Sequence, residues 1–145
     1  MRQINTIYVI QTGAYLHDIV QEAREIGFLY PAPHIYITKH SFDDDEEPFV
    51  VERPRPLCHP CALVRDSRIS TGAIGVALHV PSGNIPISQL ATAAAELSKI
   101  IEDIGISDYQ ILTNEHKKDA QIPQSSISTL YSAIANYPSY FNRLK

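Results

Sequence analysis

The sequence predicts an α+β fold of the ferredoxin-like, split β-α-β type, and three observations carry this prediction. Residues 4–39 and 73–113 each show a strand, a glycine-containing turn, an amphipathic helix, a glycine and a second strand. A chain of 145 residues has the length of one domain with one core. Three helices are expected, which are few for covering both faces of a sheet. We therefore favour a largely antiparallel sheet with its helices on one face; the alternative is an open α/β sheet with helices on both faces.

The clearest unit, residues 72–105, reads as a strand, a short turn and a helix. Side chains alternate across a strand, so one face is expected in the core; it carries Ile74, Val76, Leu78 and Val80. The other face is nearly bare and carries Ala73, Gly75, Ala77 and His79. A bare face lets another segment or a ligand approach the backbone closely. A helix packed on these small residues is the interpretation that we favour.

The helix of this unit has an apolar stripe at three- and four-residue spacing, made of Leu90, Ala94, Leu97, Ile101 and Ile104. Ser88 is the expected N-cap, and Gly105 stands where a left-handed C-terminal residue is expected. We predict that Leu97 and Ile101 are buried against the sheet.

The remaining elements follow from the same patterns. They are, in chain order, a strand over 4–11, a helix with an apolar stripe over 16–26, a strand over 34–39, a strand over 109–113, and a last helix that Ser125 or Ser126 caps and Pro138 ends.

Residues 40–71 are expected to form an irregular, proline-rich insertion on a single domain that spans residues 1–145. The segment opens with five consecutive acids, 43–47, which we interpret as a solvated loop because they lack the spacing of a calcium loop. Short strands are possible over 49–52 and 62–65. The segment is too short and too polar to hold a core of its own.

Composition narrows the class of protein. Hydrophobic residues make up 44% of the chain and charged residues 19%, which is typical of a folded protein. The net charge of −4, without a basic block, argues against a nucleic-acid partner. No apolar run is long enough to span a membrane. Two cysteines and an N-terminal stretch without a signal-peptide pattern indicate a reducing, cytoplasmic setting.

Two glycine-containing turns form the first candidate site. One turn, 11–13, follows the first strand, and the other, 81–84, follows the strand over 72–80. In the split arrangement these strands are parallel neighbours, so both turns meet at one end of the sheet, before helix N-termini that favour anions. The residues expected to bind a small anionic or polar ligand are Gln11, Thr12, Gly13, Tyr15, Ser82, Gly83 and Asn84. The alternative is that both are ordinary turns, because neither matches a phosphate-binding fingerprint.

The second candidate site is the Cys-x-x-Cys motif formed by Cys58 and Cys61. This spacing suits one half of a tetrahedral zinc site, or a redox pair. Zinc is thus the one cofactor that the sequence suggests. No second half with recognisable spacing accompanies the motif, so two ordinary cysteines are the alternative interpretation.

The function that the sequence favours is a small cytoplasmic binding or regulatory protein that acts through a protein surface or a small ligand. The reasons are the absence of a catalytic signature and the long polar insertion, where binding residues tend to lie. The alternative is a small enzyme with His79 as general base near the two turns, since a neutral imidazole suits that role near pH 7. A homodimer or larger ring is also expected, because the split fold leaves one sheet face open.

Overall fold

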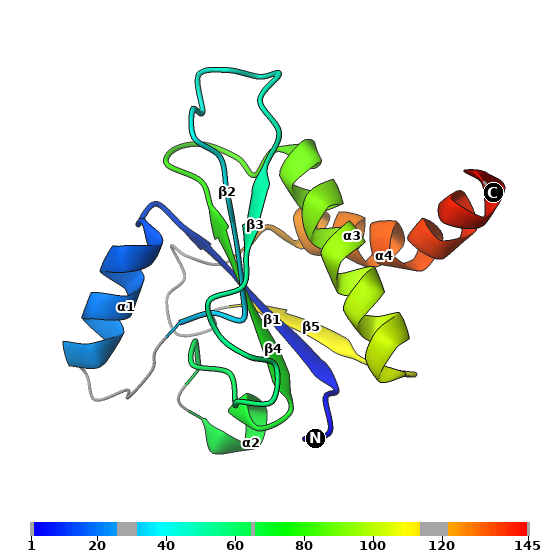
Figure 1. Cartoon of the computed structure of the whole chain (residues 1–145), viewed down its shortest axis with the longest axis horizontal. Helices are drawn as coiled ribbons and strands as arrows, with labels where there is room; N and C mark the ends of the chain where they lie inside the picture. Colours follow the sequence, from blue (N-terminus) through cyan, green and yellow to red (C-terminus); the bar gives the residue numbers. More distant parts are fainter. Residues whose placement is uncertain (1, 26–31, 65, 114–121, 145) are drawn as a thin grey trace.

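The computed structural model of the chain describes residues 2–25, 32–64, 66–113 and 122–144 (Figure 1). The elements are β1 (Thr6–Thr12), α1 (Leu16–Glu25), β2 (Ile35–Thr38), β3 (Val50–Glu52), α2 (Ser67–Ser70), β4 (Ala73–His79), α3 (Ile87–Ile104), β5 (Gln110–Thr113) and α4 (Gln124–Leu144). The expected strand over 49–52 is therefore present as β3. Residues 62–64 are not a strand, and Arg65 lies outside the described residues.

The strands form one mixed sheet with the order β3-β2-β4-β1-β5. β1 is parallel to both β4 and β5, β2 is parallel to β4, and β3 runs antiparallel to β2 at the edge. The α+β class is confirmed, and β1 and β4 are the parallel neighbours that we expected. The ferredoxin-like assignment, with its largely antiparallel sheet, is wrong, because among the described strands only β3 runs antiparallel to its neighbour. α1 and α3 each return the chain along the sheet, so β2 and β5 run parallel to the central pair.

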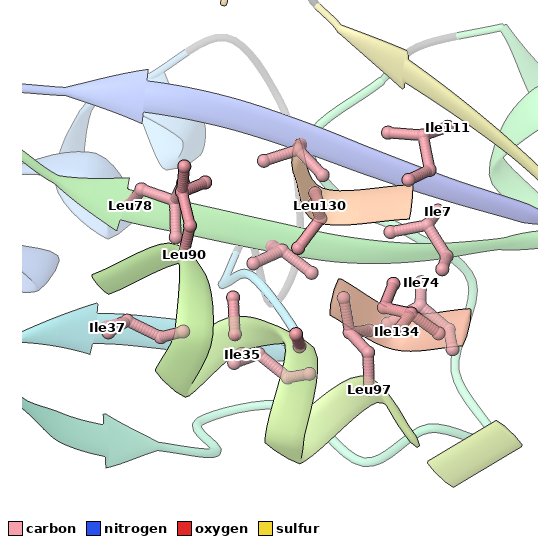
Figure 2. Packing of buried hydrophobic residues seen from close by; sticks show 14 of the residues in the cluster. Ile7, Ile35, Ile37, Ile74, Leu78, Leu90, Leu97, Ile111, Leu130 and Ile134 are labelled. Atoms are coloured by element: carbon pink, nitrogen blue, oxygen red, sulfur yellow. The ribbon is translucent and has the colours of Figure 1, made fainter. Parts of the chain in front are cut away.

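The first face of the sheet holds the main core (Figure 2). Strand residues such as Ile7, Ile74 and Leu78 meet side chains of α3 and α4, among them Leu97 and Leu130. The predicted burial of Leu97 is confirmed, since it is 0% exposed, whereas Ile101 is only partly buried against this core. The continuous apolar strand face explains why this side is closely packed.

The second face is covered by the insertion, not by a long helix. Cys61 and Val64 pack with Tyr8 of β1 and Ala73 of β4 in a smaller buried cluster. At Gly75 the approach is so close that an added Cβ would stand 2.8 Å from the Cys61 sulfur. The bare strand face therefore receives a loop, and the helix that we favoured for it is wrong.

The homo-oligomer stays a prediction, but the structure does not support the argument on which it was based. It rested on an open sheet face, and the end of the insertion lies on that face. Light scattering at micromolar and millimolar concentrations tests the mass directly.

Both long helices differ at their ends from the sequence prediction. α3 begins after Pro86, whose fixed φ of −62° sets the helix entry without a side-chain cap, so Ser88 lies inside the first turn. Gly105 has the expected left-handed conformation, with φ 79°. α4 begins at Gln124 and continues through Pro138 to Leu144.

Within the ranges that the structure describes, neither helix nor any other is long and apolar enough to cross a membrane.

Candidate functional site

The candidate site lies where three adjacent parallel strands end on the second face. Thr12 of β1 is opposite His79 of β4, and Ile37 of β2 is opposite Leu78, which puts Thr38 beside His79. Thr12, Thr38 and His79 thus form a row across the carboxyl edge of the sheet. Ligand sites of open, parallel α/β sheets lie at this edge.

His79 and Thr38 are joined by a hydrogen bond between Thr38 Oγ1 and His79 Nδ1, 2.7 Å long. A second hydrogen bond links the imidazole to the backbone of Gly13. A backbone carbonyl only accepts, so the imidazole nitrogen facing Gly13 carries the proton and Nδ1 accepts from the Thr38 hydroxyl. Burial lowers the pKa of His79, and the bond to Gly13 opposes this in part. The imidazole, 1% exposed, is therefore neutral at pH 7.

Three aromatic rings enclose this imidazole. The ring centroids of Tyr15, Phe42 and Tyr36 lie 4.9, 5.1 and 5.9 Å from that of His79. Tyr36 donates its hydroxyl to the carbonyl of Ala14, and burial raises its pKa to about 12, so it remains protonated. Tyr15 is 68% exposed although its ring touches the buried imidazole. Tyr15 is thus the solvent-facing member of the cluster.

The two turns that the sequence pointed to do lie side by side. Gln11 donates its side-chain amide to the carbonyl of Gly83 (3.2 Å), and the backbone N–H of Val80 donates to the carbonyl of Thr12. Thr12 Oγ1 accepts from the N–H of Ala14. Gly83 has a φ of +82°, which explains why a glycine is needed in that turn. Ser82 and Asn84 are exposed. That these residues bind a ligand stays a prediction.

Sequence reasoning missed Thr38, Tyr36, Phe42 and Gln89. Gln89 is 0% exposed in the first turn of α3, and its amide nitrogen donates to the carbonyls of Ile37 and His79, each at 3.0 Å. It therefore holds the ends of β2 and β4 together behind the Thr38–His79 pair. The available signal was a glutamine beside the apolar stripe of a helix, where a buried amide needs partners.

The Cys-x-x-Cys motif lies away from this edge and does not fit a zinc site. Cys58 is exposed and Cys61 is buried, and both are free thiols. Burial raises the pKa of the Cys61 thiol to about 11. Among the described residues, no three His, Cys, Asp or Glu side chains come together in a way that could hold a metal ion. His116, one of the histidines available as a further ligand, lies outside those residues.

A buried histidine near the motif has a different task. His34 Nδ1 accepts from the N–H of Gly75 (2.8 Å), and its Nε2 lies 2.8 Å from the carbonyl of His59. The imidazole thereby joins the insertion to β4 just where β2 begins. Burial lowers the pKa of His34 to about 4, so the ring is neutral at pH 7. Both ring nitrogens are thus engaged in contacts between the insertion and β4.

Comparison with known proteins gives the fold but no family. No protein-family model matches the chain, and no curated protein matches it. One similar solved structure is the N-acetylmuramoyl-L-alanine amidase LysC from Clostridium intestinale URNW, with 16% identity, a TM-score of 0.64, and 90% of this chain and 87% of that chain covered. Another is the endolysin N-acetylmuramoyl-L-alanine amidase LysCS from the same organism, with 15% identity, a TM-score of 0.66, and 90% and 85% covered. At these identities the likeness shows a shared fold.

The preference for a non-catalytic binding or regulatory protein is contradicted by this comparison. Both of the similar solved structures described above are amidases. The enzyme alternative, in which His79 acts as a base, agrees better with that fold. The sequence misled because it contains no short catalytic motif, and that absence was taken as an argument against an enzyme.

Proposed function

We propose that this chain is a small hydrolase of amide bonds, with the Thr38 hydroxyl as its nucleophile and His79 as its general base. The single observation that carries the proposal is the hydrogen bond of 2.7 Å between Thr38 Oγ1 and His79 Nδ1. A hydroxyl in contact with a neutral imidazole, which a third group orients in turn, is the arrangement that activates a weak nucleophile. Gly13 is the orienting group. The amidase fold supports the choice of an amide as the bond to be cleaved.

The reaction proceeds in two balanced steps. Thr38 Oγ1 attacks the amide carbonyl carbon, its proton passes to His79 Nδ1, and the imidazolium gives that proton to the amine nitrogen as the C–N bond breaks. Water then attacks the resulting ester while His79 takes a proton from it. The C–O bond to Thr38 breaks, the proton returns to Thr38 Oγ1, and the acid is released.

Accessibility decides which group meets the substrate. Thr38 is half-buried, whereas His79 lies beneath its aromatic neighbours. Thr38 is therefore the group that attacks the substrate, and His79 exchanges protons through its Nδ1, which lies beside the Thr38 hydroxyl.

The substrate to test first is the amide between an N-acetylmuramoyl group and L-alanine, the bond named in the titles of both similar structures. A reducing, cytoplasmic setting remains part of the proposal and is supported by two free thiols. A soluble N-acetylmuramoyl peptide is therefore the appropriate probe. The exposed ring of Tyr15 beside the pair offers an apolar surface for such a substrate.

The experiment follows amine release from N-acetylmuramoyl-L-alanyl peptide by the purified chain. Thr38→Val removes the hydroxyl at nearly constant shape, and we expect a loss of activity of about 10²-fold or more, whereas Thr38→Ser retains activity. His79→Gln should lose activity similarly. Thr92→Val, at a half-buried threonine of α3 whose hydroxyl donates to the carbonyl of Ser88, is the matched control.

Two results would contradict the proposal. Full activity in a folded Thr38→Val variant would show that Thr38 is not the nucleophile. If the parent chain cleaved none of several N-acyl amides, the chain would not be an amide hydrolase.

A further inference from the structure

A second hollow, separate from the Thr38–His79 edge, lies between α1 and the proline-rich segment of the insertion. Its volume is about 400 Å³, within the range of small-molecule sites. It shares no described lining residue with the Thr38–His79 pair. A ligand bound in this hollow would therefore lie apart from that pair.

The walls of this hollow are largely apolar and stiff. They consist of Val20 from α1, Ala32 at the approach to β2, and Pro54 and Pro56 from the insertion. The ring of a proline fixes its backbone φ, so the insertion side of the hollow is shaped before any ligand arrives. A preshaped wall reduces the ordering cost of binding.

The polar groups that line the hollow are cationic or basic. They are Arg24, Arg55 and His59, and no acidic side chain is among the described lining residues. This local charge is opposite in sign to the net charge of −4 of the whole chain. A positive hollow on an otherwise acidic protein selects anions.

Arg55 is held in place and partly removed from water. Its Nε–H donates to the carbonyl of Pro60 at 2.7 Å. Burial lowers the pKa of Arg55, and burial together with the charge of Arg55 lowers that of the neighbouring Arg2. Arg2 bonds to neutral groups, the carbonyls of Leu57 and Thr71 among them. An anion in the hollow would offset this concentration of positive charge.

Glu96, the acidic residue that lines a neighbouring hollow, already has an ion-pair partner. A smaller hollow of about 300 Å³ shares Arg55 and Pro56 and includes Glu96 of α3. Glu96 pairs with Arg53 at 2.5 Å, which ties the insertion to α3. Arg53 is therefore a described partner of that carboxylate, and the charged side chains among the described lining residues of the first hollow are arginines.

We propose that the hollow between α1 and residues 54–59 binds a small monocarboxylate with an apolar body. Arg24 and Arg55 hold the carboxylate, because a guanidinium matches its two oxygens in a planar, two-bonded geometry. The apolar body lies against Val20 and the two prolines. A neutral molecule of the same shape lacks the charge-assisted hydrogen bonds and binds more weakly.

The experiment compares 4-phenylbutanoate with its neutral amide, 4-phenylbutanamide, on the whole chain by calorimetry and by amide chemical shifts. We expect the acid to bind at least about ten-fold more tightly than the amide. Arg24→Gln should abolish most of this preference. Val20→Phe, which fills the hollow without changing charge, should weaken both ligands. Arg68→Gln is the matched control, since Arg68 is exposed and paired with Asp66.

Three outcomes overturn the proposal: equal binding of acid and amide, an equal loss in the Arg24→Gln and Arg68→Gln variants, or shifts centred on His79 instead of the hollow. Absence of binding by the acid at millimolar concentration overturns it as well. None of these results depends on catalytic activity, so they leave the proposed hydrolase to its own test.

Discussion

α1 and α3 follow the same sequence pattern, yet only one of them is built into the core. α3 contains eight buried residues, including polar ones. In α1 no residue whose side chain is described is buried, and Leu16, Ile19 and Val20 are half-buried at most. Figure 1 shows α3 lying along the sheet with α4 beside it, while α1 stands at the opposite side of the sheet.

The difference comes from the surface that each helix meets. The first sheet face is continuous and apolar, and small residues of α3 such as Ala93 and Ala94 let the helix approach it closely. On the second face the end of the insertion occupies the centre, with Cys61 and Leu63 against Gly75. A periodic stripe therefore predicts which side of a helix faces inward, but the depth of burial depends on the partner.

The largest effect should come from Leu97 in α3. Leu97→Ala removes a fully buried side chain between α3 and the sheet, and we expect a loss of about 2–5 kcal/mol in the free energy of unfolding. Urea unfolding followed by circular dichroism measures it. A melting temperature within a degree or two of the parent would mean that α3 does not carry the core.

The contrast between α1 and α3 also shows which features of the fold and the site could be predicted from the sequence. The stripe of α3 and the stop at Gly105 are local features, and they were predicted from spacing and residue type alone. The largely parallel sheet was not, because the relative direction of paired strands depends on how the two strand–helix–strand units are placed beside each other and not on the strand residues. The pairing of Thr38 with His79 was also missed, since these residues meet only through the parallel register of β2 and β4.

The second prediction concerns the first strand–helix–strand unit, in which α1 buries few side chains. It tests whether His34 contributes to the stability of this unit. His34, at the start of β2, has its pKa lowered from 6.5 to about 4, so the native state binds a proton less readily than the unfolded chain. Its contribution is fully present above pH 6.5 and is lost as the pH falls towards 4. The expected loss is about 1.4 kcal/mol for each pH unit.

The measurement is unfolding free energy against pH for the parent and for His34→Gln, which does not titrate. Burial lowers the pKa of His79 as well, so the unfolding free energy of both proteins also falls with falling pH because of His79. Only the difference between the two curves reports His34. Parallel curves between pH 6.5 and 4 would show that His34 does not tie the insertion to β4.

The smallest effect is expected in α1, and a matched pair of isoleucines makes the comparison direct. Ile100 in α3 is buried, whereas Ile19 in α1 is half-buried. The same change, Ile→Ala, removes the same atoms and gains the same helix propensity in both helices. Ile100→Ala should cost about 2–4 kcal/mol, because it leaves a cavity in the core. Ile19→Ala should cost less than about 1 kcal/mol, because a half-exposed side chain gains little from folding and its removal leaves no closed cavity. Chemical denaturation of both variants under one condition gives the two values, and equal values would mean that α1 is packed as firmly as α3.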